Sequence, residues 1–289
     1  MHGWLYPLLS CVGLLISAAL GQKLLRAAEG APEATRPSMP ASVHPHLVFA
    51  GALFGALIGA KLGYFFAEWL PQRLSQSPLA SFEALLFGRT VLGALLGGYA
   101  GVELVKRLIH YRRATGDGFA VMAPLSIGLG RIGCWGEGCC LGVEHARSWF
   151  TLDDAQGIAR WPAVPVELAF NVLFGAAVAY YVLRMKPLPF LKGQLFHVYL
   201  VSYGAFRLWH ETLRETPHAH GMSGYQGLAV LVVLLGGVRF VQRQRGKTKW
   251  EDEGAAGDGE EPVEQDPPEH DAQQGQREVR AEAPREEDP

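Results

Sequence analysis

The longest apolar stretches of this sequence lack a polar stripe. Residues 91–102 (VLGALLGGYAGV) and 228–238 (LAVLVVLLGGV) carry no charged side chain at helical spacing. A soluble helical bundle presents a polar face to water, so the pattern argues against that class of protein. Runs of about 20 apolar residues are instead long enough to cross a bilayer. We expect an all-α, polytopic membrane protein with seven transmembrane helices, at Leu5–Leu25, Val48–Leu70, Thr90–Ile109, Phe119–Glu137, Val164–Met185, Gly193–Leu213 and Gly224–Gln242.

The first ten residues, MHGWLYPLLS, contain no lysine or arginine. A cleavable signal peptide begins with a positively charged region, so we expect the first span to be retained. Basic residues elsewhere concentrate in alternate connections between the spans, with fifteen in one set and five in the other. The positive-inside rule places the richer set in the cytoplasm. The N-terminus is then outside and the C-terminus cytoplasmic.

The formal net charge of -2 gives no indication of a nucleic-acid partner. Residues 250–289 dominate this value, and they are rich in Glu, Asp, Pro, Gly and Gln. A segment of this composition cannot bury enough apolar surface to offset the entropy of the chain. We therefore expect residues 1–249 to form the membrane domain and residues 250–289 to form a disordered, acidic, cytoplasmic tail.

Charged residues occur at the outer ends of two predicted spans. The segment GRIGCWGEGCCLG (130–142) brings Arg131 to the end of the fourth span. In the sixth span, Arg207 and Glu211 are four residues apart and share a helical face, which Arg214 continues. One interpretation is a structural ion pair between Arg207 and Glu211. The other is a phosphate or carboxylate site, because charges in spans usually face the protein interior and guanidinium groups suit oxyanions.

Several motifs resemble the prolipoprotein diacylglyceryl transferase family. They are GAKLGYFF (59–66), FGRTVLGALLGG (87–98), GLGRIG (128–133), PVEL (165–168), YGAFRLWHETLRE (203–215) and GYQGLAVLVVLLG (224–236). The resemblance covers roughly residues 45–240. It implies a seven-span enzyme of the bacterial inner membrane that transfers the diacylglyceryl group of phosphatidylglycerol to the thiol of a lipobox cysteine in prolipoproteins. The products would be a thioether and glycerol phosphate, and we expect no cofactor.

The resemblance also assigns site residues. Arg131, Arg207 and Glu211 match an arginine of the family's loop and the arginine and glutamate of its sixth span, so we expect them to be catalytic. Tyr64 and Gly142 match a tyrosine and a glycine of the family's motifs. We expect these two residues and the two arginines to bind the substrate.

The sequence departs from the family where a proton has to be accepted. The attacking group is a thiolate, so the acceptor thiol must lose its proton. Leu92 stands where the family has a histidine. Three other candidates remain, namely Glu137, His210 and, more distantly, His145. We include Glu137 among the expected catalytic residues, since a carboxylate in apolar surroundings can act as a base.

The cysteines of the 130–142 segment admit several interpretations. Cys134 and Cys139 replace a polar asparagine and a glutamate of the family. On an oxidising side of the membrane, Cys134 could form a disulfide with Cys139 or Cys140. Alternatives are free thiols, or a reactive thiol that carries a covalent intermediate. The C-x4-C-C spacing lacks the second ligand pair typical of zinc sites, so we expect no metal. Cys11 is expected to be a core residue of the first span.

Two other classes of function remain open at this point. The arginines could hold an anionic lipid in a non-enzymatic membrane protein or a transporter, in which no bond is broken. A membrane thiol–disulfide protein is the third possibility, although the C-x-x-C spacing of that chemistry is absent.

Overall fold

The computed structural model describes residues 12–13, 15–17, 19, 45–75, 82–111, 115–185, 188–216, 218–219 and 221–246. Within this part, the chain is mostly helical, as expected. The predicted first span lies largely outside the described residues. Cys11 and the predicted disordered tail, residues 250–289, also lie outside them.

The long helices are separated by short turns and two small hairpins. In chain order the described elements are α2 (Pro45–Tyr64), η2 (Phe65–Trp69), α3 (Leu70–Leu74), α4 (Phe82–Phe87), α5 (Val91–Leu108), α6 (Gly116–Gly136), β1 (Leu152–Asp153), β2 (Ala159–Arg160), α7 (Ala163–Arg184), η3 (Pro189–Leu191), α8 (Leu195–His210), η4 (Glu211–Leu213), β3 (His218–Ala219), β4 (Met222–Ser223) and α9 (Gly224–Gln244). The pairs β1–β2 and β3–β4 are antiparallel.

Six of the seven predicted spans coincide with helices. Among the described residues, four helical segments are long and apolar enough to cross a membrane, namely 47–74, 116–136, 163–184 and 224–244. Helix α8 has only 16 residues before the η4 turn, and α5 carries three charged residues in its last two turns. The structure therefore supports a helical membrane protein, and the count of seven spans and their orientation stay predictions.

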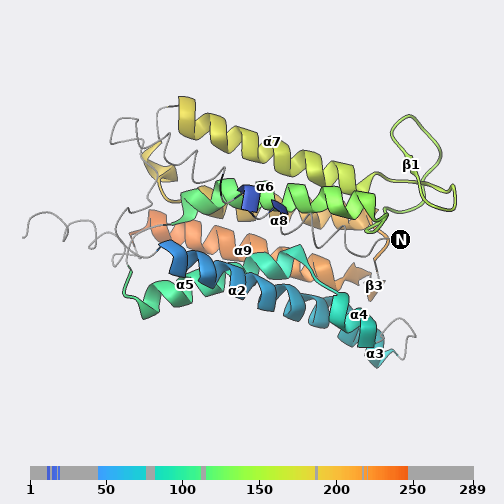
Figure 1. Ribbon diagram of the computed structural model, residues 1–289, viewed down its shortest axis with the longest axis horizontal. Helices are drawn as coiled ribbons and strands as arrows, with labels where there is room; N and C mark the ends of the chain where they lie inside the picture. Colours follow the sequence, from blue (N-terminus) through green and yellow to red (C-terminus); the bar gives the residue numbers. More distant parts are fainter. Residues whose placement is uncertain are drawn as a thin grey trace, which may run out of the picture.

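The long helices form two halves joined by α8 and α9. Helix α7 lies along one side of the molecule, α2 and α5 lie along the opposite side, and α6, α8 and α9 lie between them (Figure 1). The principal contacts are α6 with α7, α8 with α9, and α2 with α5. The buried core lies where α5, α8 and α9 meet, around Leu92, Tyr199, Tyr203 and Val232. The end of α6, the start of α7 and the end of α8 meet at the end of the molecule that carries β1 and β3 (Figure 1).

Helices α2 and α5 pack with their backbones in contact. Glycines recur every four residues on both, at 51, 55, 59 and 63 and at 93, 97 and 101. A Cβ atom added to Gly97 would lie 2.2 Å from the carbonyl oxygen of Gly55, and one added to Gly59 would lie 2.3 Å from that of Gly93. Small residues at this spacing allow helices in lipid to approach closely. This glycine contact holds α2 and α5 together in the half of the molecule that carries Tyr64.

Candidate active site

Two arginines predicted from the sequence meet at one buried carboxylate. Nη2 of Arg131, in the last turns of α6, lies 2.7 Å from Oε1 of Glu167. Nη1 of Arg207, near the end of α8, lies 3.0 Å from Oε2 of the same residue. Glu167 is 1% exposed, and both arginines are buried. The structure therefore brings Arg131 and Arg207 together, with Glu167 between them.

Two more side chains complete the surroundings of Glu167. Nη1 of Arg214, which follows η4, lies 3.7 Å from Oε2 of Glu167. The hydroxyl group of Tyr203, one turn before Arg207 on α8, donates a hydrogen bond of 2.6 Å to Oε1. One carboxylate thus faces three guanidinium groups and a phenol. We refer to Arg131, Arg207, Arg214 and Glu167 as the arginine cluster.

The loop after α6 fixes the position of Arg214. Gly142 forms a β-bridge with Arg214, and the amide of Val143 donates to the carbonyl of Leu213 at 3.1 Å. On its other side, Gly142 lies so close to Trp161 that an added Cβ would be 2.2 Å from the Trp161 carbonyl oxygen. The described contacts of Gly142 are thus structural, and its predicted part in substrate binding stays a prediction.

The arginine cluster contains polar atoms that the described protein does not satisfy. The Nε atoms of Arg131, Arg207 and Arg214 are buried and have no hydrogen-bond partner among the described residues. The same holds for Oε1 of Glu211, whose other oxygen pairs with Arg207. Buried polar groups in proteins are nearly always paired, so unpaired donors in one cluster indicate a place for an anion. Both the ion pair and the anion site predicted for the sixth span are compatible with this geometry.

The predicted proton acceptors are not equally placed. His145 is exposed on the loop, with Nδ1 3.0 Å from the carbonyl oxygen of Ala146. Glu137 follows α6, and its buried Oε1 has no partner in the described part of the chain. His210 is fully buried at the end of α8 and stacks on Phe206, with ring centroids 4.9 Å apart. His210 interacts electrostatically with Glu167, Arg207 and Arg214 of the arginine cluster.

Tyr64 belongs to a neighbouring group of side chains. Its ring packs on Gly88, where an added Cβ would lie 2.1 Å from a ring carbon. The chain then enters the π-helical turn η2, which directs Glu68 onto the hydroxyl group of Tyr225 at the start of α9. Tyr225 is within electrostatic range of Glu211. The role of Tyr64 in binding a substrate stays a prediction.

The three cysteines of the loop lie together beside Arg131. Their Sγ atoms are all within 4.8 Å of one another, and all three are free thiols in the structure. Nη1 of Arg131 lies 3.5 Å from Sγ of Cys140 and 3.8 Å from Sγ of Cys134. Hydrogen bonds from the thiols of Cys134 and Cys139 lower the pKa of Cys140 well below its usual range, and the positive charges of Arg131 and Arg214 act in the same direction.

Glu167 is the residue of the arginine cluster that the sequence analysis did not single out. It stands in the PVEL motif (165–168), where the sequence analysis assigned no role to the glutamate. The available signal was a single carboxylate in an otherwise apolar span, since an ionisable residue there usually has a partner or a function. Tyr203 gave no such signal, because tyrosines are common in membrane helices and its hydrogen bond depends on the position of α7.

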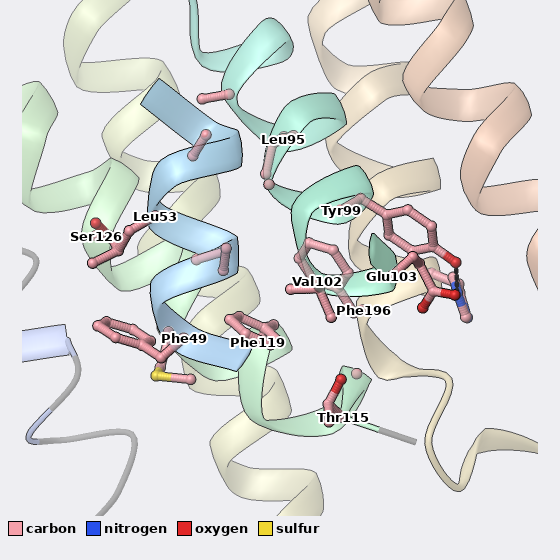
Figure 2. A pocket seen from close by; sticks show the side chains of 18 of the residues that line it. Phe49, Leu53, Leu95, Tyr99, Val102, Glu103, Thr115, Phe119, Ser126 and Phe196 are labelled. Atoms are coloured by element: carbon pink, nitrogen blue, oxygen red, sulfur yellow. Dashed lines mark hydrogen bonds between the residues drawn. The ribbon is translucent and has the colours of Figure 1, made fainter. Parts of the chain in front are cut away.

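A described cavity lies away from the arginine cluster. It measures about 240 Å³ and lies between α2, α5, α6 and α8, near the starts of α6 and α8. Figure 2 shows its mostly apolar lining, including Phe49, Leu53, Leu95, Val102 and Phe119. At its edge, Arg239 donates to the Tyr99 hydroxyl at 2.7 Å and pairs with Glu103 at 3.0 Å. We place the candidate active site at the arginine cluster because its buried, unpaired donors offer a place for an anion, whereas the cavity has a mostly apolar lining.

Comparison with known proteins agrees with the motifs. The prolipoprotein diacylglyceryl transferase family matches residues 4–242. The chain is 26% identical over 194 residues to phosphatidylglycerol–prolipoprotein diacylglyceryl transferase 2 of Clostridium perfringens, covering 64% of this chain and 73% of that protein. It is 28% identical over 235 residues to the corresponding transferase of Nitrosospira multiformis, covering 80% and 75%. For that of Teredinibacter turnerae the identity is 30% over 213 residues, covering 69% and 71%. This chain therefore belongs to the prolipoprotein diacylglyceryl transferase family.

Proposed function

We propose that this protein transfers the diacylglyceryl group of phosphatidylglycerol to the thiol of a lipobox cysteine in prolipoproteins. The observation that carries the proposal is the arginine cluster. Three guanidinium groups from α6, α8 and the segment after η4 surround Glu167, and each keeps a buried Nε donor without a partner among the described residues. A phosphate head group supplies the acceptors that these donors lack.

The chemistry explains why such a site accelerates the reaction. The thiolate sulfur attacks the glycerol carbon that carries the phosphate, a C–S bond forms, and the C–O bond breaks with its electron pair on the phosphate. The leaving glycerol phosphate carries more negative charge than the phosphodiester did. Fixed guanidinium groups therefore stabilise the transition state more than the bound lipid, and this difference lowers the barrier.

Glu167 holds the cluster ready before the lipid binds. Without it, three buried guanidinium groups would repel one another across a short distance. With it, the Nη atoms of Arg131 and Arg207 are fixed by ion pairs while their Nε atoms remain available. Tyr203 in turn fixes the carboxylate. A site that is arranged in advance needs little rearrangement when the phosphate charge develops.

Direct transfer fits better than an intermediate on Cys139 or Cys140. A diacylglyceryl group on either thiol would form a thioether, and the next step would have to expel a thiolate from a carbon atom. Covalent catalysis is useful when it divides a difficult step into two easier ones, and this intermediate does not.

The proposal includes an orientation in the bacterial inner membrane. We propose seven spans, with the N-terminus outside and the C-terminus cytoplasmic. Basic residues of α5, α7 and α9, among them Lys106, Arg184 and Arg243, lie at the ends of their helices that are remote from the arginine cluster. Their position supports a cytoplasmic location for that end. The arginine cluster is then at the outer leaflet, where it can meet a prolipoprotein.

The test is turnover of phosphatidylglycerol and a lipobox peptide by arginine variants in detergent. We expect Arg131→Ala and Arg207→Ala each to lower the rate about a hundredfold, or about 3 kcal/mol, as for removal of a donor to a developing anion. Lysine at either position should restore only part of the rate, because it keeps the charge and loses the fork.

Arg147→Ala is the matched control for these variants. This arginine is exposed on the loop, pairs with exposed Asp153 at 3.1 Å and donates to the Gly157 carbonyl oxygen at 3.2 Å. The Arg147→Ala variant should turn over the substrates at the wild-type rate. Wild-type turnover by folded Arg131→Ala and Arg207→Ala would show that the cluster is structural and that the proposal is wrong.

A further inference from the structure

The three thiols converge because the chain reverses sharply after α6. Helix α6 ends at Gly136, and Gly138 adopts a positive φ of 64°. The amide of Cys139 then donates to the carbonyl oxygen of Cys134 at 3.1 Å. This turn returns Cys139 and Cys140 to the helix end from which they came. The result is a three-thiol cluster, formed by Cys134, Cys139 and Cys140.

Cys140 is held in a conformation that costs free energy. Its φ of 62° lies in the left-handed region, which residues other than glycine seldom adopt. Such a conformation is strained, and it persists where the surrounding structure requires it. Here it directs the Cys140 sulfur toward Cys134 and Arg131. A glycine would relax the backbone at this position but would remove the sulfur atom.

The positive charge needed beside three thiolates is already present. Arg131 divides its guanidinium group between two sets of partners. Nη1 faces the sulfurs of Cys134 and Cys140, at 3.8 and 3.5 Å, and Nη2 faces Glu167 at 2.7 Å. The three-thiol cluster and the arginine cluster therefore share one residue. A nucleophile bound at the sulfurs would lie next to a phosphate bound at the arginines.

We propose that Cys134, Cys139 and Cys140 bind a Zn²⁺ ion whose fourth position takes the thiol of the acceptor cysteine. This inference rests on the proposed transferase function. Catalytic zinc sites have three protein ligands and one open position, and Zn–S bonds are about 2.3 Å long. Three such sulfurs on a tetrahedron are about 3.8 Å apart. The observed spread of at most 4.8 Å requires only a small closure of the loop.

The surroundings leave the fourth position to a substrate. In the part of the chain that the structure describes, no histidine or carboxylate completes the group around the three sulfurs. Cys134 is buried, whereas Cys139 is exposed, so one side of the cluster opens away from the helices. A peptide cysteine can approach from that side. Soft thiolate ligands favour zinc over magnesium or calcium at such a site.

Zinc would supply the deprotonation directly at the bound thiol, whereas neither Glu137 nor His210 belongs to the described group around the three sulfurs. Leu92 stands where the family has a histidine, and it is buried among apolar residues. His145 faces the outside of the loop. A thiol that coordinates zinc loses its proton outright. The cysteines at two positions that differ from the family, Cys134 and Cys139, would thus compensate for the loss of the family's histidine at Leu92.

The steps balance without a redox change. A zinc-bound hydroxide takes the proton of the acceptor thiol and leaves as water, and the thiolate takes its place on the metal. The thiolate sulfur attacks the glycerol carbon of phosphatidylglycerol, the C–O bond breaks, and glycerol phosphate leaves with the electron pair at the arginine cluster. The thioether dissociates from zinc. Water then rebinds and releases one proton to solvent.

The first measurement is metal content of the full-length protein purified in detergent without chelator. We expect about one Zn²⁺ per chain, the stoichiometry of a single site with three ligands. Serine in place of Cys134, Cys139 or Cys140 should abolish retention of the ion. Cys11→Ser is the matched control and should retain it. A wild-type protein that neither retains nor takes up Zn²⁺, or that contains a disulfide among these three residues as its active form, overturns the proposal.

The second measurement uses Co²⁺ in place of zinc and requires no turnover. Three thiolates should give intense sulfur-to-cobalt charge-transfer bands and the visible bands of a tetrahedral site. A lipobox peptide with cysteine should shift these bands, and the same peptide with serine should not. A spectrum that is unchanged by the cysteine peptide overturns the proposed role of the fourth position. This readout also serves if a cysteine variant fails to fold, because it is made on the wild-type protein.

The two proposals can fail separately. Turnover at the wild-type rate by verified metal-free protein would overturn the zinc site and leave the transferase function intact. Zinc retention and a peptide-dependent cobalt spectrum, without turnover of phosphatidylglycerol, would support the zinc site as a thiol-binding centre and overturn the transferase function.

Discussion

At the scale of single residues, the candidate site depends on Glu167. A carboxylate that is 1% exposed meets three guanidinium groups and one phenol. Burying any one of these charges alone would be costly, and the carboxylate compensates part of the positive charge. The arginines supply the charge that the chemistry uses, and Glu167 determines where that charge is held.

Glu167→Gln should therefore destabilise the protein. The change keeps the shape of the side chain and can still accept from Tyr203, but it leaves three buried guanidinium groups without their shared anion. Breaking a buried ion pair in this way costs about 3 kcal/mol or more. We expect a clearly lower apparent melting temperature in detergent. Glu144→Gln, on the exposed side of the loop and 3.8 Å from Arg160, should melt with the wild type. Equal melting of both variants would contradict this account.

At the scale of secondary-structure elements, the glycine contact between α2 and α5 is the feature most sensitive to a single atom. A Cβ at Gly97 would lie 2.2 Å from the backbone oxygen of Gly55, and a backbone atom cannot move aside as a side chain can. The two helices would have to separate. Van der Waals contact is a main source of helix association in lipid, so the separation removes much of what joins them.

We expect Gly97→Ala to lower the stability by about 1–3 kcal/mol, as an overpacked site does. Gly237→Ala is the matched control, because nothing lies within 4 Å of a Cβ at that position of α9. Alanine is the better helix former, so this control should be neutral or gain up to about 1 kcal/mol. Thermal unfolding of both proteins in the same detergent makes the comparison. If Gly97→Ala unfolds at a temperature no lower than the control, the proposed close backbone contact is wrong.

The conformation of the loop between α6 and α7 depends on Arg160. Arg160 lies 2.5 Å from Oδ2 of Asp154 and 2.8 Å from Oε2 of Glu215, and it donates to the Gly142 carbonyl at 3.2 Å. It therefore ties the hairpin of β1 and β2 to the segment that carries Arg214. The hydrogen bond from Arg160 holds the pKa of Asp154 below its ordinary value of 3.8, assisted by the backbone amide of Ile158.

The sign of the pH effect follows from that lowered pKa. A carboxylate that is more acidic in the folded loop stabilises the loop above its unfolded pKa, and this stabilisation is lost as the pH falls through the folded value. We expect proteolysis of residues 142–162 to accelerate as the pH falls below about 3.8. Asp154→Asn should be cut rapidly already at neutral pH. Asp153→Asn should show the same acceleration of proteolysis at low pH as the wild type. If Asp154→Asn also shows this pH dependence, Asp154 is not its source.

At the scale of the whole molecule, the candidate site and the basic ends of the helices lie at opposite ends. The arginine cluster and the three-thiol cluster lie where α6 and α8 end, and the apolar cavity and many basic residues lie where these helices begin. If the basic end is cytoplasmic, the reaction takes place at the outer face. A reporter fused after residue 249 should then be active only as a cytoplasmic fusion. Activity of a periplasmic reporter at that position would reverse the orientation and place the site on the other face.

The sequence by itself predicted the helical segments and two residues of the candidate site. Apolar runs such as 91–102 predicted helices to within a few residues, because burial of a whole helix requires apolar side chains all round. Arg131 and Arg207 could be identified because charges are rare in such runs. The spacing of glycines in α2 and α5 was also visible, but which helix they face is not a property of either helix alone.

Only the tertiary structure decided which groups meet. Glu167 lies far from Arg131 and Arg207 along the chain, and the three come together because α6, α7 and α8 run in alternating directions. The three thiols present the clearest case. Their C-x4-C-C spacing argued against a metal site, since such sites are identified by ligand pairs on regular turns. A positive φ at Gly138 and at Cys140 reverses the chain and brings all three sulfurs within 4.8 Å, and spacing alone does not reveal that geometry.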